Sequence, residues 1–221
     1  MSAEKHAVRE ISGPQAFAAA FSVSRETLDR LKTYESALQL WQKTINLVAP
    51  STLGHVWHRH FADSAQLVAL APPAPKTWVD LGSGAGFPGL VVAILLAPEA
   101  KTRVTLVESD ARKAAFLREV ARQVAVPVDI FCERAEQAAT RVSLHACDVV
   151  SARAVAPLTR LLALAKPFTG AHTVCLFPKG RDANTELQDA EIAWKFNVEL
   201  GPSLTDSDAR IAIIRELTPR R

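Results

Sequence analysis

The feature that most constrains the fold is a glycine-rich stretch that directly follows a short apolar run. Residues 78–81 have the composition of a buried strand, and glycine stands at every second position from Gly82 to Gly86. Glycine lacks the Cβ that would keep a ligand away from the backbone, and Pro88 is favourable in the first turn of a helix. The apolar run Leu90–Leu96 then predicts a helix buried against a sheet. The stretch therefore predicts a strand, a ligand-binding turn and a helix, in that order.

Two adenosine-containing cofactors compete for this turn. The dinucleotide pattern G-x-G-x-x-G, counted from Gly82 and Gly84, requires a third glycine at position 87, where the chain has Phe87. The pattern present is D-x-G-x-G-x-G, in which Asp80 precedes the glycines and no diphosphate has to be accommodated. It favours S-adenosylmethionine over a nicotinamide dinucleotide. The remaining alternative is a glycine turn without a ligand, which is disfavoured because three glycines lower local stability.

Three further positions extend the predicted cofactor site. Glu108 ends the next predicted strand, 22 residues after Gly86, where a carboxylate can accept both hydroxyls of a ribose. Ala135 and Glu136 follow the third predicted strand, where a backbone N–H can read the edge of an adenine ring. A ribose-binding carboxylate is common to both kinds of cofactor site, so it supports an adenosine ligand without choosing between them. A surface glutamate near a helix start is the structural alternative for Glu108.

The order of the predicted elements indicates an α/β fold with a doubly wound, Rossmann-like parallel sheet. Apolar strand segments alternate with helical ones after the glycine turn, and ligands of such sheets bind beyond the carboxyl ends of the strands. The segments Lys195–Leu200 and Arg210–Leu217 flank a turn-forming stretch and predict a hairpin, so the last strand is expected to be antiparallel. This finish is typical of class I S-adenosylmethionine-dependent methyltransferases. The other predicted strands are 102–107, 127–132, 147–152 and 172–177.

The first third of the chain differs from the rest. Its apolar residues recur at helical spacing after Ser24, which is a favourable N-cap, and a second helix is predicted over Thr52–Leu70. The proline-containing segment Ala71–Lys76 then leads into the first strand. We therefore expect residues 1–75 to form an N-terminal helical extension and residues 76–221 to form the cofactor-binding domain.

Composition and residue spacing exclude several other classes. The 221 residues, 48% of them hydrophobic, suit one α/β domain with an extension. The polar first residues lack the apolar core of a signal peptide, so a cytoplasmic protein is expected, and the longest uncharged stretch is too interrupted by glycine and proline to span a membrane. The cysteines are expected to be small core residues, and the histidines at 55, 58 and 60 lack the partners of a zinc site. No metal is expected.

The distribution of charge is more informative than the net charge of +3. No acidic residue lies between Asp148 and Asp182. Arg153, Lys179 and Arg181 in this stretch follow predicted strands, so they are expected to gather at the ligand-binding rim, where they could bind a polyanion. An ordinary surface with counter-charges from elsewhere is the alternative.

Arg153 has more than one possible role. It follows a buried run, and its guanidinium could face a cofactor carboxylate, a substrate phosphate or a structural ion-pair partner. His60, together with Asp63, could lie on the rim of the same pocket.

Taken together, these motifs resemble those of the small-subunit ribosomal RNA methyltransferase G family, also called glucose-inhibited division protein B. The resemblance covers nearly the whole chain. It implies methyl transfer from S-adenosylmethionine to N7 of one guanine, conventionally position 527, in the 16S rRNA or the small ribosomal subunit. It also implies cofactor roles for Gly82, Phe87, Ala135, Glu136 and Arg153. The segments that carry it are Trp41, Asn46-Leu47, Arg59 to Ser64, Asp80 to Gly89, Arg134 to Glu136, Ser151 to Ala154 and Lys179-Gly180.

The chain departs from the family pattern in the extension. Gln42 stands where the family often has Asn, and Val48-Ala49 replaces a more usual Thr-Ser. The extension is therefore expected to contact RNA in its own way, while the cofactor turn is unaffected.

The implied reaction needs no general base, because guanine N7 carries a lone pair and no proton; alignment and electrostatics suffice. No catalytic residue is therefore expected. Gly82, Gly84 and Glu108 would fix the cofactor, while His60, Lys179 and Arg181 would bind the RNA. The alternatives are a small-molecule methyltransferase, which the fold also supports, and a ribosome-assembly binding protein.

Overall fold

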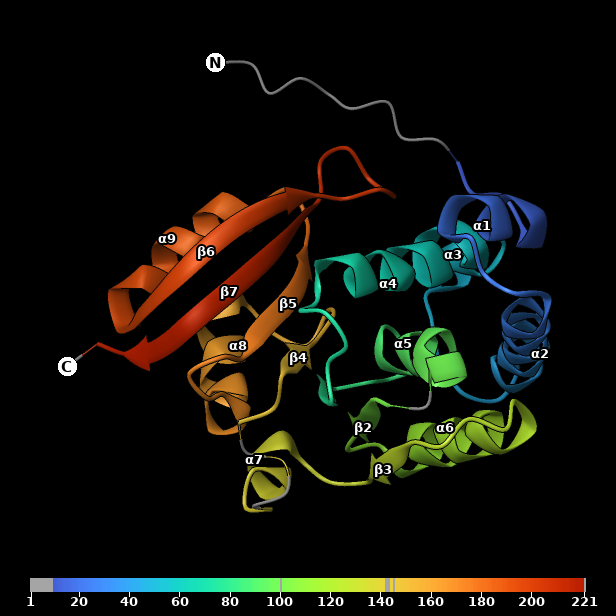
Figure 1. The fold of residues 1–221 in the computed structure, drawn as a ribbon, viewed down its shortest axis with the longest axis horizontal. Helices are drawn as coiled ribbons and strands as arrows, with labels where there is room; N and C mark the ends of the chain where they lie inside the picture. Colours follow the sequence, from blue (N-terminus) through green and yellow to red (C-terminus); the bar gives the residue numbers. More distant parts are fainter. Residues whose placement is uncertain (1–9, 100, 142–143, 145, 221) are drawn as a thin grey trace.

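A mixed β-sheet organises the computed structural model, which describes residues 10–99, 101–141, 144 and 146–220. The polar first residues, on which the expected absence of a signal peptide rests, lie outside this range. In the described part of the chain the sheet has seven strands in the order β3-β2-β1-β4-β5-β7-β6 (Figure 1). The strands are β1 (Thr77–Leu81), β2 (Arg103–Val107), β3 (Asp129–Phe131), β4 (Val149–Ser151), β5 (Val174–Lys179), β6 (Trp194–Pro202) and β7 (Arg210–Pro219).

The direction of the strands confirms the predicted doubly wound arrangement with an antiparallel finish. β1 to β5 pair in parallel, whereas β7 is antiparallel to both β5 and β6. The hairpin β6–β7 therefore inserts β7 next to β5 and leaves β6 at the edge. Because β1, β4 and β5 all end at the same edge, the segments that follow them lie close together.

Side chains alternate along the strands, so each face of the sheet contributes to its own hydrophobic core. Trp78 and Val149 belong to one core, which is closed by α2 (Arg25–Trp41), α5 (Gly89–Leu96) and α6 (Ala111–Gln123). Val79 and Val150, their neighbours in sequence, belong to the other. That second core is closed by α7 (Ala135–Ala138), α8 (Leu158–Ala165) and α9 (Ala183–Ala193). The result is three layers, with helices on both faces of the sheet (Figure 1).

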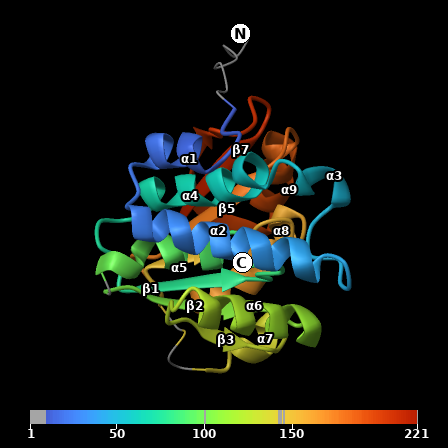
Figure 2. The same ribbon diagram turned by 90° about the vertical axis from the view of Figure 1, so that its right-hand side faces the viewer.

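Helix α5 has almost no polar face because it is covered on both sides. All of its residues from Gly89 to Ile94 are buried, and it packs against β1 and β2 on one side and against α2 and α4 (Asp63–Ala65) on the other. Figure 2 shows α2 outside it. A helix that is apolar all round must be buried in this way. The expected division at residue 75 stays a prediction, and side chains from both sides of it share one core.

The extension is helical, as predicted, but its second half is irregular. Ser24 caps α2 by accepting a hydrogen bond from the Thr27 N–H at 3.1 Å. Instead of one helix over Thr52–Leu70, the chain forms α3 (Pro50–Leu53), a π-helical turn (Trp57–Ala62), α4 and a 3₁₀ turn (Gln66–Leu70). Helix α1 (Pro14–Phe21) precedes α2. Two short 3₁₀ turns elsewhere cover Ala97–Glu99 and Lys166–Phe168.

The π-helical turn carries a histidine that joins distant parts of the chain. His58 accepts a hydrogen bond from the Ile11 N–H at Nδ1 and donates from Nε2 to the carbonyl of Thr205, which lies in the β6–β7 loop. π-Helical turns within α-helices are frequent at functional sites. None of the described helices combines the length and apolar character needed to cross a membrane.

Candidate functional site

The glycine turn between β1 and α5 has the backbone geometry that requires glycine. Gly82, Gly84 and Gly86 all have positive φ, at 63°, 58° and 95°. A Cβ on Gly82 would also lie 2.6 Å from a methyl group of Val155, and one on Gly86 would collide with Tyr34. Any larger residue at Gly82 or Gly86 would therefore clash with a neighbouring side chain. The predicted strand, turn and helix are confirmed, with α5 beginning at Gly89 directly after Pro88.

Glu108 is bound to the turn itself, which the sequence did not indicate. Its Oε2 accepts a hydrogen bond from the Gly84 N–H at 2.7 Å, and its Oε1 accepts one from the Asp110 N–H at 2.7 Å. The residue is 7% exposed. A carboxylate has about four lone-pair positions, so two backbone donors leave others for ligand hydroxyls. Glu108 therefore fixes the turn and the start of α6 in one geometry.

A cavity of about 710 Å³ opens beside this turn, at the carboxyl ends of β1 and β2. Three of the predicted cofactor residues, Gly82, Ala135 and Glu136, line it, and Leu81 and Val107 add apolar wall. This volume and mixed lining are typical of small-ligand sites. Gly84 and Glu108 are outside its lining and are joined by their mutual hydrogen bond. Their roles toward a cofactor stay predictions.

Phe87 points away from the cavity and into the helical extension. It is 4% exposed, and its ring stacks on Tyr34 at 5.4 Å and on His60 at 4.8 Å between ring centroids. The Arg153 guanidinium carbon lies 5.2 Å from the same ring centroid, within the range of a cation–π contact. Phe87 thus links the cofactor turn to the extension, and its predicted cofactor role stays a prediction.

A second cavity, a cleft of about 730 Å³, adjoins the first. Its walls come from the extension, from the loop after β4, from the end of β5 with the start of α9, and from the β6–β7 loop. Ala156 lines both cavities. The residues that the sequence placed at the ligand-binding rim mostly line this cleft: His60, Asp63, Arg153 and Lys179. Arg181 is exposed and does not line it.

Arg153 fastens the extension to the sheet. Its guanidinium donates to Asp63 Oδ2 at 2.9 Å, to His60 Nδ1 at 2.9 Å and to the Arg59 carbonyl at 3.0 Å. The Arg153 and Asp63 side chains are 17% and 16% exposed. Asp63 in turn accepts from the Thr205 hydroxyl at 2.9 Å. Of the roles that the sequence left open for Arg153, the structure shows the ion pair; cofactor binding stays a prediction.

His60 is held as a neutral ring with one defined tautomer. Because Arg153 can only donate, Nδ1 of His60 accepts, so Nε2 carries the proton and donates to Thr52 Oγ1 at 2.8 Å. Burial, reinforced by the positive charges of Arg153 and then Arg59, lowers the pKa of His60 to about 3. A neutral, buried imidazole stacked on Phe87 therefore forms one wall of the cleft.

Acid is expected to destabilise the protein through His60. Its pKa in the folded chain, about 3, lies below its ordinary value of 6.5, so between these pH values the unfolded chain binds more protons and stability falls as pH falls. From pH 6.5 to 4.5 we expect wild type to lose roughly 2 kcal/mol more than His60→Gln, by urea unfolding. Exposed His55 gives the control: His55→Gln should follow wild type. Equal acid sensitivity of His60→Gln and wild type would contradict the assignment.

Asp80 is buried beneath the turn and shapes it from within. Ser151 donates to its Oδ1 at 2.7 Å and the Gly89 N–H to its Oδ2 at 3.1 Å. Burial raises the pKa of Asp80 to about 6, although these hydrogen bonds oppose the shift. Trp78 donates to Ser151 at 2.8 Å and extends the network. The acidic residue of the D-x-G-x-G-x-G pattern thus joins β1, β4 and the start of α5.

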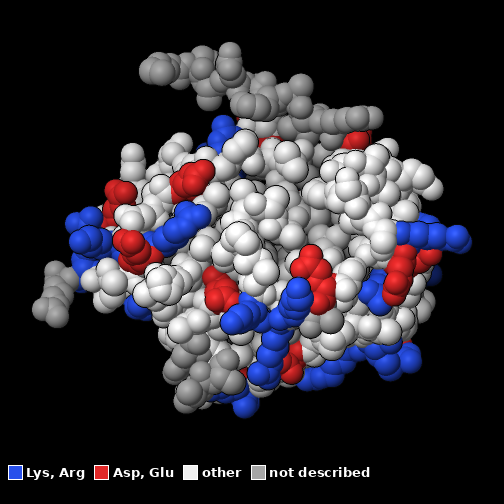
Figure 3. All heavy atoms as spheres, viewed as in Figure 1, with Lys and Arg blue, Asp and Glu red and all other residues white. Residues whose placement is uncertain are grey.

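Cations that line the cleft form ion pairs with carboxylates of other elements. Lys179 contacts Glu186 at 2.8 Å, and Arg59 contacts Asp206 at 3.3 Å, in addition to the pair formed by Arg153. Two cations of the stretch without acidic residues, Arg153 and Lys179, thus have counter-charges from other elements, as the alternative reading of the sequence expected. On the face shown in Figure 3, too, basic and acidic side chains are interspersed.

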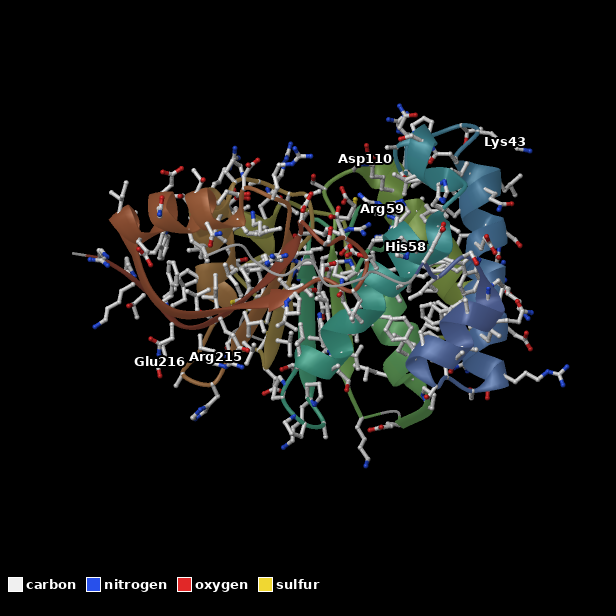
Figure 4. The ribbon with its side chains drawn as sticks, turned by 90° about the horizontal axis from the view of Figure 1, so that it is seen from above. Lys43, His58, Arg59, Asp110, Arg215 and Glu216 are labelled. Carbon is white, nitrogen blue, oxygen red and sulfur yellow. The ribbon has the colours of Figure 1, made fainter. Side chains whose placement is uncertain are left out.

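Figure 4 shows where the exposed charges lie relative to the site. Arg59, which lines the cleft, and Asp110, which follows β2, lie toward the same edge of the view as Lys43, whereas Arg215 and Glu216 lie toward the other. Lys43 is exposed at the end of α2. Of these two cations of the extension, Arg59 lines the cleft and Lys43 lies outside the lining of both cavities.

The described residues contain no cluster of three or more metal-ligating side chains. His55 lies near Glu10, and His58 and His60 have the partners given above. Cys147 and Cys175 are buried, and burial raises their pKa values to about 11 and about 12. The expectation that all three cysteines are core residues is wrong for Cys132, which is exposed just after the edge strand β3.

Solved structures similar to this one are methyltransferase-like in fold. A methyltransferase from Geobacter sulfurreducens superposes with a TM-score of 0.57 and 13% identity, covering 95% of this chain and 99% of that one. A protein from Corynebacterium glutamicum has a TM-score of 0.57 and 15% identity, covering 92% and 97%. At such identities the likeness concerns the fold alone. It confirms the predicted class I methyltransferase fold.

Sequence comparison is more specific. The family model described as rRNA small subunit methyltransferase G matches residues 27–209. The ribosomal RNA small subunit methyltransferase G of Rhodospirillum centenum is 55% identical over 204 residues, or 92% of this chain and 91% of the relative. The protein of the same description from Parvibaculum lavamentivorans is 47% identical over 208 residues, or 94% and 91%. This chain therefore belongs to the rRNA small subunit methyltransferase G family.

Proposed function

We propose that this protein transfers a methyl group from S-adenosylmethionine to N7 of a guanine, conventionally position 527, in the 16S rRNA of the small ribosomal subunit. The observation that carries the proposal is the pair of adjoining cavities, one at the glycine turn and one toward the extension, in a chain of this family. Methyl transfer requires two ligands side by side, and Ala156 borders both cavities.

The residues around the first cavity fit an adenosyl cofactor. At Gly84 no side chain occupies the space of the missing Cβ, and the Glu108 carboxylate that binds the Gly84 N–H has acceptor capacity to spare. Gly82, Ala135 and Glu136 would line the bound cofactor. When bound, S-adenosylmethionine supplies an electrophilic methyl group on a sulfonium centre.

The second cavity suits a base that has been turned out of an RNA strand. Its neutral imidazole and apolar loop atoms offer a surface for a flat ring, and its Arg153–Asp63 pair offers a donor and an acceptor for the ring edge. Because N7 has a free lone pair, the chain needs to orient the base and does not need to remove a proton. Lys43 and Arg59 at the exposed edge, together with exposed Arg181, would meet the phosphate backbone.

The test is methyl transfer to small ribosomal subunits from a strain that lacks this gene. With labelled S-adenosylmethionine we expect label in 16S rRNA as 7-methylguanosine, with subunit binding that weakens steeply as salt rises. Subunits from the parent strain, which are already modified, serve as the control and should accept little label. Label that enters small molecules but not rRNA would contradict the proposal, as would binding of subunits without any transfer.

A further inference from the structure

The loop Ala154–Pro157 forms the partition between the two cavities. Ala156 lines both of them, Val155 lines the cavity at the glycine turn, and Ala154 and Pro157 line the cleft. Val155 also packs directly against Gly82, where it occupies the space of the missing Cβ. The position of this loop therefore sets how ligands in the two cavities face each other.

The conformation of the partition loop depends on residues outside the loop. It has no regular secondary structure, and Ala154 has a φ of 55°, in the left-handed region that residues with a Cβ rarely adopt. Such a conformation persists only where the surrounding structure enforces it, and it is found frequently at functional sites. Contacts from outside the loop must therefore keep it in place.

Besides the packing of Val155 on Gly82, two side chains from beyond the loop supply such contacts at its C-terminal part. The Lys179 ammonium, at the end of β5, donates to the Ala156 carbonyl at 3.2 Å and to Glu186 Oε2 at 2.8 Å. The same carboxylate oxygen of Glu186, on α9, accepts the Leu158 N–H at 2.7 Å. The pair thus holds the last part of the loop and the first residue of α8 together.

The burial of Lys179 argues against a direct contact between its ammonium group and RNA phosphates. The Lys179 side chain is 8% exposed and that of Glu186 is 27% exposed. A lysine that neutralises a phosphate must present its ammonium to solvent, whereas two protein acceptors already engage this one. A carboxylate next to it would also repel a phosphate.

We propose that Lys179 and Glu186 are positioning residues: they fix the partition loop, and through it the alignment of the acceptor base with the methyl donor, without themselves binding RNA. The inference rests on the proposed function. It replaces the RNA-binding role that the sequence predicted for Lys179. In a reaction without a general base, alignment is the main contribution that the chain can make, and a displacement of about 1 Å lowers a rate by about 100-fold.

The experiment compares Lys179→Met and Glu186→Gln with matched controls. Lys195→Met removes an exposed lysine from β6, and Glu191→Gln changes an exposed glutamate on α9 itself. For each protein we would measure single-turnover methyl transfer to unmodified small subunits, the Kd for those subunits at several salt concentrations, and the Kd for S-adenosylmethionine. Circular dichroism would establish that each variant is folded.

Positioning predicts a rate at least roughly tenfold lower in both variants, with both Kd values within about twofold of wild type. The dependence of log Kd on log salt should be unchanged, and both controls should behave as wild type. Lys179→Arg should restore part of the rate, since it keeps a donor near Ala156. Glu186→Gln keeps the size of the side chain, so it decides the question even where Lys179→Met fails to fold.

Opposite results would overturn the inference. A phosphate contact predicts that Lys179→Met lowers the salt slope by about one and that Glu186→Gln binds subunits more tightly. Wild-type rates in both variants would show that the loop needs no such support. If the wild-type protein itself transferred no methyl group to subunits, the proposed function would fail, and the positioning role would fail with it. If the wild-type protein were active and both variants had its rate, the positioning role alone would be rejected.

Discussion

Glu108→Ala is expected to weaken S-adenosylmethionine binding by at least about 100-fold, or ~3 kcal/mol. In the wild-type protein the Glu108 carboxylate accepts the N–H groups of Gly84 and Asp110. Its removal would release the turn from the start of α6 and would also delete the predicted acceptor for the ribose hydroxyls. Each hydrogen bond to a charged group contributes about 1.5–3 kcal/mol. Isothermal titration of the folded variant measures the loss.

Glu119→Ala provides the matched control for this change. Glu119 lies on α6, the helix that Glu108 precedes, and its side chain accepts hydrogen bonds from Arg122 and Gln123 of the same helix, away from the turn. Cofactor affinity in this variant should stay within about twofold of wild type, since exposed ion pairs contribute little. If Glu108→Ala bound the cofactor as tightly as Glu119→Ala, the carboxylate would have no part in the cofactor site.

The second large effect is on stability. Arg153→Met is expected to lower the free energy of unfolding by about 3 kcal/mol, because it leaves the largely buried Asp63 carboxylate without its cation and removes the contact over Phe87. Urea unfolding followed by tryptophan fluorescence would measure the change. A double-mutant cycle with Asp63→Asn should give a coupling energy above about 1 kcal/mol, since the two groups contact each other directly.

Arg103→Met is the control for Arg153→Met. Arg103 forms an ion pair with Asp129, but the two side chains are 59% and 40% exposed, and such pairs contribute about 1 kcal/mol at most. The difference between the two variants therefore isolates the effect of burial. Equal stability losses, or a coupling energy near zero between positions 153 and 63, would show that the pair does not fasten the extension to the sheet.

Features encoded by local patterns were predicted well. The glycine turn, the buried strands and the final hairpin each depend on residues that are neighbours in sequence, and their spacing is enough to reveal them. Even there, sequence left the direction of a side chain open. Phe87 stands in the turn by position, yet its ring packs between the extension and Arg153, because the fold places Tyr34 and His60 beside it.

Pairings between distant residues could not be predicted. Asp63 and Arg153 are 90 residues apart, and the sequence around either residue does not indicate the other as its partner. For the charges after Asp148, sequence left a basic rim and a compensated surface both open, because it shows spacing but not the carboxylates that face Arg153 and Lys179 from other elements. Glu186 was missed for a related reason: α9 was not predicted, so its first turns had no place near the cleft.

The contacts of His58 with Ile11 and Thr205 have a consequence for biosynthesis. The extension is translated before the sheet, but one of its contacts, from His58 to Thr205, joins residues that are 147 positions apart. Likewise, Asp63 accepts the hydrogen bond from the Thr205 hydroxyl only after the β6–β7 loop has been synthesised. The helices of the extension share a core with α5 and α6, which are synthesised earlier, so it is the contacts with the hairpin loop that depend on the late part of the chain. A product that terminates before the hairpin would lack the wall of the cleft that Thr205, Asp206 and Ala209 supply.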